Sequence, residues 1–174
     1  LEYMDESLRK FSAWFGEYPY PQAIAVDGLS TEGRDMEYPM ITLIGDAPDL
    51  FTFEITIAHE LGHFWFYGLL GSNERKYGWM DEGLANYCET RYVKSKYAPG
   101  DKIQDDQVGA FGLATLIYRY NRYNHRQAQE IVYRSQASIN SDQSLGLSAE
   151  DYSQYGYLGD IYYKPCIGLD YLQG

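Results

Sequence analysis

The sequence predicts an α+β domain in which a small β element precedes a mostly helical body. Apolar residues recur at helical spacing over residues 2–15, which indicates an amphipathic helix there. Residues 23–26 and 40–44 form short apolar runs bounded by turn residues, as is typical of strands. The patterns after residue 50 are mainly helical, so the expected strands are confined to the N-terminal part of the chain.

The helical body is expected to contain several helices joined by loops. They are expected over about 50–69, 79–97, 104–121, 125–138 and from near Lys164 onward. Asp49 is placed to cap the first of these helices. The stretch 138–156 is loop-like, with room for one helical turn near Ala149. Because the chain contains no repeat and no linker, we interpret residues 1–174 as a single domain.

Composition limits the partners of the chain. The formal net charge is −11 and the isoelectric point about 4.6, which argues against nucleic acid, because the phosphate backbone requires a basic surface. An acidic surface also serves solubility, and we give that interpretation the greater weight. No apolar run reaches the roughly 18 residues of a membrane span. Cys88 and Cys166 lie outside any metal or redox motif and are expected to be buried free thiols.

The two ends of the sequence resemble cuts through a longer chain. The sequence opens at Leu1 inside one helical pattern and stops at Gly174 directly after another. We therefore expect a fragment of a multidomain protein whose flanking domains pack against it. Such a segment carries no targeting signal, so the sequence indicates no compartment.

The stretch TIAHELGHFW, residues 56–65, carries two of the three histidines. His59 and His63 are four residues apart, so both rings project from one helical face and can converge on one metal ion. Glu60 is rotated by about 100° from His59 and can reach a water held by that ion. This is the H-E-x-x-H arrangement of zinc peptidases. The competing interpretation is a helix that carries two incidental histidines.

A catalytic zinc ion needs a third protein ligand and an open position for water. Glu82 is the candidate, because the 18 residues between it and His63 suffice for a loop and an antiparallel return helix. His125, the remaining histidine, lies in a polar stretch at a predicted helix start and is interpreted as solvated. The longer H-E-x-x-H-x-x-G-x-x-H pattern is absent, since Phe66 and Leu69 occupy its last two fixed positions.

Two further acidic residues lie near Glu82. Glu89 is seven residues along, two turns on the same face, and could accept a hydrogen bond from a histidine ligand and fix its tautomer. A solvent-facing charge is an equally good interpretation of Glu89. Asp81 is expected to cap or orient the helix rather than to bind metal.

Residues 59–89, HELGHFWFYGLLGSNERKYGWMDEGLANYCE, resemble the zinc aminopeptidase family of the gluzincin type, which includes aminopeptidase N and leukotriene hydrolase. The shared features are H-E-x-x-H, the 18 intervening residues and the Glu-Gly-Leu-Ala that starts at Glu82. The resemblance implies a thermolysin-like catalytic domain that holds one zinc ion per chain by His59, His63 and Glu82. It covers most of the chain and is weakest between residues 100 and 150.

An N-terminal segment extends the resemblance. Met36 and Glu37 align with the family's Gly-x-Met-Glu-Asn signature, in which the Glu holds the free amine of the substrate. The signature is altered in this chain, since Arg34 and Asp35 precede Met36 and Tyr38 replaces the Asn. The altered loop leaves open whether the site has exopeptidase geometry.

A C-terminal segment, DIYYKPCIGLDYL, resembles the family's stretch around its catalytic tyrosine. Tyr162 is the residue in register, and Tyr163 is the next candidate if the register shifts by one. Proline is tolerated in the first turn of a helix, so Pro165 marks where a helix starts. Tyr162 is therefore expected just outside that helix, free to point at the metal.

The resemblance implies aminopeptidase-type hydrolysis of peptide bonds by a zinc-bound water. Glu60 would act as general base and then acid, Tyr162 would stabilise the oxyanion, and Glu37 would meet the ammonium of a peptide substrate. Two alternatives stay open. One is a catalytically weak metal-binding or peptide-binding remnant. The other keeps the zinc but acts as an endopeptidase or hydrolyses epoxides, as one family member does.

Overall fold

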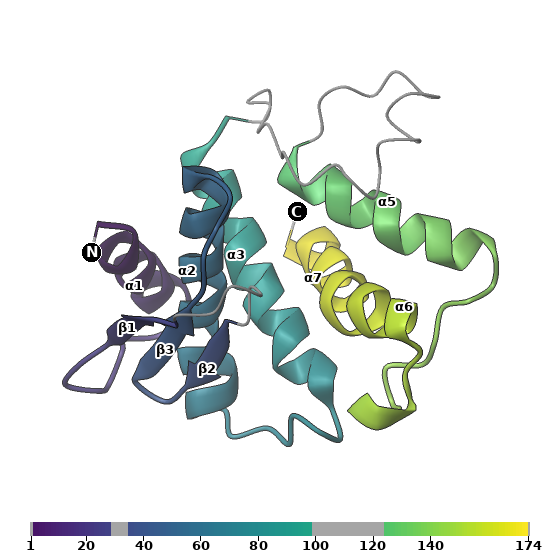
Figure 1. Ribbon diagram of the computed structural model, residues 1–174, viewed down its shortest axis with the longest axis horizontal. Helices are drawn as coiled ribbons and strands as arrows, with labels where there is room; N and C mark the ends of the chain where they lie inside the picture. Colours follow the sequence, from purple (N-terminus) through teal and green to yellow (C-terminus); the bar gives the residue numbers. More distant parts are fainter. Residues whose placement is uncertain (1, 29–34, 99–123, 174) are drawn as a thin grey trace.

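The computed structural model describes residues 2–28, 35–98 and 124–173 of the chain. A small sheet lies beside the N-terminal helices, and the C-terminal helices lie on the far side of helix α3 (Glu82–Lys96) (Figure 1). The helix expected over 104–121 lies outside the described residues. In the part of the chain that the structure describes, no helix is both long and apolar enough to cross a membrane.

The first helix, α1 (Glu2–Phe15), coincides with the predicted segment. It buries Met4 and Phe11 in the core, where they meet α2. The chain leaves the helix at Gly16, whose φ of +111° lies in the left-handed region that glycine adopts without a Cβ penalty. The carbonyl of Gly16 accepts a hydrogen bond from Trp65 Nε1 at 2.9 Å, which ties the end of this helix to the core.

The sheet has the order β1-β3-β2, with β1 (Ile24–Asp27) parallel and β2 (Met36–Tyr38) antiparallel to the central β3 (Ile41–Ile44). The two predicted strands are confirmed to within one residue. The sequence does not predict β2, because three residues are too few for a period of two to stand out. Thr42 and Ile44 of β3 are buried, so the central strand presents one polar and one apolar side chain to the interior.

Helix α2 (Leu50–His63) begins where the sequence predicts. The Asp49 carboxylate accepts a hydrogen bond from Thr52 N at 2.8 Å and caps the helix. The helix then continues as a π-helix, η1 (Phe64–Leu69), so the predicted span 50–69 is correct in extent but not in the geometry of its last turns. π-Helical turns are rare and often lie at functional sites.

Helix α3 (Glu82–Lys96) packs along α2 in the opposite direction. Side-chain pairs between the two helices join residues in reverse order, His63 with Glu82 at one end and Glu54 with Tyr92 at the other. The sequence places the start of this helix a few residues early, since a separate 3₁₀ turn precedes it.

Two glycines allow close packing beside the histidines and Glu82. A Cβ on Gly62 of α2 would lie 3.1 Å from Ala85 Cα and 3.2 Å from Cys88 Cβ. A Cβ on Gly83 of α3 would lie only 2.4 Å from Pro165 Cγ. Neither position has room for a larger residue, so glycine at both sites sets the distance between the elements that carry the site.

The C-terminal part contains α5 (His125–Ser138), the turn η3 (Ala149–Asp151), α6 (Gln154–Gly156), the π-helix η4 (Tyr157–Tyr163) and α7 (Lys164–Gln173). The helix of residues 125–138, the turn near Ala149 and the helix start at Lys164 are confirmed. Tyr162 lies just outside α7, as predicted, but it belongs to the π-helix η4 that directly precedes α7. Because Pro165 fits in the first turn of α7, η4 and α7 follow each other without a break.

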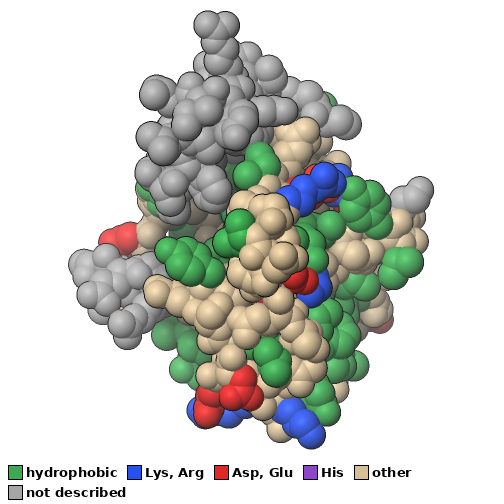
Figure 2. All heavy atoms as spheres, turned by 90° about the vertical axis from the view of Figure 1, so that its right-hand side faces the viewer, with side chains coloured by type: hydrophobic (Ala, Val, Ile, Leu, Met, Phe, Trp, Pro, Cys, Tyr) green, Lys and Arg blue, Asp and Glu red, His purple; other side chains and the backbone are tan. Residues whose placement is uncertain are grey.

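The core and the surface have few further features that bear on function. Cys88 and Cys166 are free and buried, as predicted. Large hydrophobic side chains are exposed in the C-terminal part, among them Tyr155 and Leu172. Figure 2 views this side of the molecule and shows hydrophobic side chains interspersed with polar and charged ones.

Candidate metal centre

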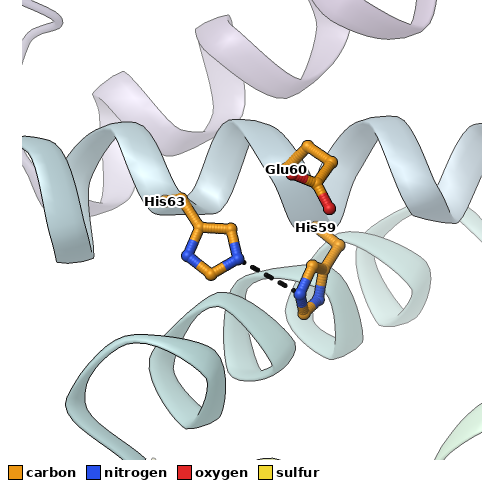
Figure 3. Close-up of side chains that lie close together, drawn as sticks. All are labelled: His59, Glu60 and His63. Carbon is orange, nitrogen blue, oxygen red and sulfur yellow. Dashed lines mark hydrogen bonds between the residues drawn. The ribbon is translucent and has the colours of Figure 1, made fainter. Parts of the chain in front are cut away.

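Three donor atoms from α2 and α3 converge on one point. The Nε2 atoms of His59 and His63 lie 3.3 Å apart and face each other from one side of α2 (Figure 3). Oε2 of Glu82 lies 3.2 Å from the first of these nitrogens and 3.4 Å from the second. The three atoms thus form a nearly equilateral triangle.

This triangle matches one face of a zinc coordination tetrahedron. With Zn–N and Zn–O bonds of roughly 2.0–2.1 Å, neighbouring ligand atoms in a tetrahedral site stand about 3.3 Å apart. Two imidazole nitrogens and one carboxylate oxygen are also a donor set that zinc accepts at catalytic sites. The residues therefore fit a zinc ion in both chemistry and spacing, with the fourth position left to a water or a substrate.

A carboxylate forms a hydrogen bond with the other ring nitrogen, Nδ1, of each histidine. Glu89 Oε2 lies 3.0 Å from His59 Nδ1, and Asp81 Oδ1 lies 2.5 Å from His63 Nδ1. When Nδ1–H is donated in this way and the ring is neutral, Nε2 carries the lone pair that a metal ion requires. Asp81 makes no side-chain cap bond to α3, so of the two roles expected for it, the structure gives it the orienting one, directed at His63.

The carboxylates and imidazoles change each other's proton affinity. Burial alone would lower the pKa of His63, but hydrogen bonds to Asp81 and Glu82 raise it to about 10. The pKa of His59 is likewise raised, against burial, by Glu82 and Glu89. Burial would raise the pKa of Glu82, yet the two histidines hold it well below its usual range. Positive charge is thus favoured between the rings, whether it is carried by protons or by a metal ion.

Glu60 lies on the turn between the two histidines (Figure 3). Burial is the main cause that raises its pKa to about 7, and the charges of His59 and His63 oppose this shift. Oε2 of Glu60 lies 3.2 Å from the hydroxyl of Thr42, which is fully buried. The motifs of the sequence do not indicate Thr42, whose only signal is a polar residue in the apolar run MITLI.

A cavity of about 280 Å³ opens beside these groups. Five carboxylates line it, together with His59 and Tyr162: Asp35, Glu37, Glu60, Glu82 and Glu89. No lysine or arginine lines it among the described residues. A cavity of this charge favours cationic groups over anionic ones.

Glu37 and Tyr162, the two residues that the family resemblance indicates outside the zinc motif, both line this cavity. Glu37 lies on β2 opposite Thr42 of β3 and is half-buried; burial raises its pKa, and the charge of His63 opposes the shift. The ring of Tyr162 stacks on that of His59, with 5.9 Å between centroids and 11° between planes. Burial, the negative charge of Glu82 and a hydrogen bond to it raise the pKa of Tyr162, so the phenol stays protonated. Tyr163 does not line the cavity.

Two other sets of three side chains could also hold an ion. Glu37, His63 and Asp81 offer ligand atoms within 4.8 Å of one another, as do His59, Glu60 and His63. In the set of Glu37, His63 and Asp81, Asp81 already accepts the Nδ1 proton of His63. We therefore favour the Nε2 face, where the donor atoms have tetrahedral spacing.

His125 is not the solvated residue that its polar sequence context indicates. Its side chain is 14% exposed, and its Nε2 pairs with Oε1 of Glu89. The reason is tertiary: α5 packs against α3 and brings the ring to Glu89 from a distant part of the sequence. Glu89 is accordingly buried between two histidines, which lower its pKa to about 2 against the effect of burial.

Comparison with known proteins adds no relative. Searches of protein-family models, of curated proteins and of solved structures each found no match to the chain. Inferences about function therefore depend on the sequence motif and on the geometry of the site.

Proposed function

We propose that this chain is a zinc-dependent metallopeptidase domain of the aminopeptidase type. One observation carries the proposal: two imidazole nitrogens and a carboxylate oxygen, 3.2–3.4 Å apart, form the face of a tetrahedral site, with Glu60 beside it. The side-chain pattern that supports the family resemblance is the same one that forms this site.

His59, His63 and Glu82 would hold the ion, and Asp81 and Glu89 would keep the two rings oriented. When bound, zinc would lower the pKa of a water molecule and draw charge from the attacked carbonyl. Glu60 would take the proton of that water and later deliver it to the leaving amine. Burial raises the pKa of Glu60, and this favours uptake of a proton by its carboxylate, as both steps require.

Tyr162 would serve the oxyanion. Its raised pKa keeps the phenolic proton in place, so the side chain is a hydrogen-bond donor at any ordinary pH. Its stacking on His59 keeps the phenol close to the ligand set, which is where negative charge develops during hydrolysis.

Glu37 would bind the free amine of a peptide. The carboxylate lies on the edge strand β2, in the wall of the cavity that His59 and Glu82 also line. A fixed distance between amine and attacked carbonyl is what restricts an exopeptidase to the first residue. The altered loop around Glu37 leaves the endopeptidase alternative to experiment.

The mechanistic test is Glu60→Gln. This variant should keep one zinc ion per chain and lose roughly 10²- to 10⁴-fold in the hydrolysis of amino-acid naphthylamides, because a positioned base is removed while the ligands stay. Glu2→Gln, which changes an exposed carboxylate on α1, is the matched control and should be fully active. Full activity of Glu60→Gln would remove Glu60 from the mechanism.

A substrate panel tests the exopeptidase assignment. Free-amine naphthylamides should be cleaved, and their N-blocked counterparts should not, because a blocked amine carries no positive charge to pair with Glu37. Equal cleavage of both would establish an endopeptidase. Zinc binding without any hydrolysis would establish the metal-binding remnant.

A further inference from the structure

The third histidine of the chain lies behind the metal centre, on the far side of Glu89. His125 is the first residue of α5, where Asn124 and Gln127 form a capping box that fixes the start of the helix. The imidazole packs edge-on against Phe51 of α2, with 6.2 Å between centroids. The ring is therefore held between elements of the fold rather than free in solvent.

Glu89 joins His125 to the metal centre. One of its oxygens, Oε2, lies 3.0 Å from His59 Nδ1, and the other, Oε1, contacts His125 Nε2. The Glu89 side chain is 9% exposed. A buried carboxylate costs free energy when its oxygens lack donors, and His125 supplies the donor for one of them.

Gln129 helps to fix the position of the imidazole. Its amide oxygen accepts hydrogen bonds from Thr90 Oγ1 at 3.2 Å and from Cys166 Sγ at 3.5 Å. Its amide nitrogen then faces His125 Nε2 at 2.9 Å. His125 Nε2 cannot both accept from this amide and donate to Glu89. Because the ionised Glu89 needs a donor, the Nε2 proton is directed at Glu89, and the Gln129 amide contacts the ring without a hydrogen bond to Nε2.

We propose that His125 is a positioning residue for the metal centre. By donating to Glu89, it holds that carboxylate against His59 Nδ1 and keeps the Nε2 lone pair of His59 directed at the ion. The inference rests on the proposed function, since it requires that an ion bind at His59. Loss of a hydrogen-bond partner of a ligand costs about 10- to 100-fold in metal affinity, and His125, one contact further out, should be worth about tenfold.

The test compares zinc affinity in four proteins by competition with a chelator. His125→Ala should bind zinc about tenfold more weakly than the unchanged chain. His125→Gln, which keeps an N–H donor near the position of Nε2, should stay within about threefold. Arg134→Ala, on the same helix with a side chain 69% exposed, should bind as tightly as the unchanged chain. If His125→Ala does not fold, His125→Asn takes its place, because its amide is shorter than the imidazole.

Two further readouts separate positioning from simple support of the fold. The metal-free proteins should unfold at similar temperatures, and cobalt bound to the His125→Ala site should show a changed visible spectrum that His125→Gln restores. Equal zinc affinity in His125→Ala and the unchanged chain would overturn the inference alone. Equally weak binding by the Ala and Gln variants, with equally lowered unfolding temperatures, would overturn it as well. Failure of the unchanged chain to bind zinc would overturn the proposed function together with the inference.

Discussion

The two ends of the α2–α3 pair bury carboxylates between the same helices but neutralise them in different ways. At one end, the Glu54 carboxylate accepts hydrogen bonds from Tyr92 at 2.6 Å and Tyr97 at 2.7 Å, and Lys96 pairs with it at 2.7 Å. At the other end, the partners of Glu82 are the two imidazoles of His59 and His63. We call these the lysine end and the histidine end.

The difference indicates why the lysine end is suited to support the fold and the histidine end to bind an ion. Lys96 is a permanent cation, and its ammonium also reaches Glu6 of α1 at 2.7 Å, so the lysine end joins three helices. An imidazole instead offers a lone pair that a proton or a metal ion can occupy. The histidine end therefore has exchangeable positive charge, and that exchange is what a metal site requires.

The largest effect should come from Glu82→Gln at the histidine end. Removal of the anionic ligand should weaken zinc binding by at least about a hundredfold, more than the loss of an outer hydrogen-bond partner. The metal-free protein should lose little stability, because the change also removes a buried charge. Chelator competition measures the first quantity and thermal unfolding without metal the second. Unchanged zinc affinity would mean that Glu82 is not a ligand.

Glu54→Gln at the lysine end should instead lower the stability of the fold and leave zinc binding unchanged. Lys96 would lose a charged partner in a site where Glu54 is buried, and the free energy of unfolding should fall by about 1–3 kcal/mol. Zinc affinity per folded chain should not change. Urea unfolding checks the prediction, with Asp5→Asn as control, since Asp5 is 71% exposed and should alter stability by less than about 0.5 kcal/mol. A loss of zinc in Glu54→Gln would show that the two ends are not independent.

The smallest effect is a pH dependence at the lysine end. Burial would raise the pKa of Glu6, but hydrogen bonds from Lys96, Tyr92 and Lys10 lower it from 4.5 to about 2. Because the pKa of Glu6 is lower in the folded than in the unfolded state, its ionised carboxylate stabilises the folded protein at pH values above the unfolded-state pKa. This contribution is lost as the pH falls from about 4.5 to about 2. The stability advantage of the unchanged chain over Glu6→Gln should therefore shrink across that window. The measurement is the free energy of unfolding of both proteins as a function of pH, and an equal pH dependence in the two would contradict the prediction.

Local patterns suffice for much of the fold and for the positions of the three proposed ligands. The period of the apolar residues predicts α1, Asp49 marks the start of α2, and the spacing of His59, His63 and Glu82 depends only on the helical repeat and the length of one loop. These features are short-range, so the sequence carries them directly.

The remaining features depend on long-range contacts or on rare geometry. His125 and Thr42 meet the site only because α5 and β3 pack against it, and nothing in their neighbouring residues indicates this. The π-helix that holds Tyr162 has the same apolar character as an α-helix, so hydrophobic periodicity cannot distinguish the two.

The most direct measurement is anomalous diffraction at the zinc edge from zinc-soaked crystals. We predict one peak per chain, within about 2.0–2.2 Å of His59 Nε2, His63 Nε2 and a carboxylate oxygen of Glu82. A peak between Glu37, His63 and Asp81, or the absence of any peak at the histidines, would contradict it.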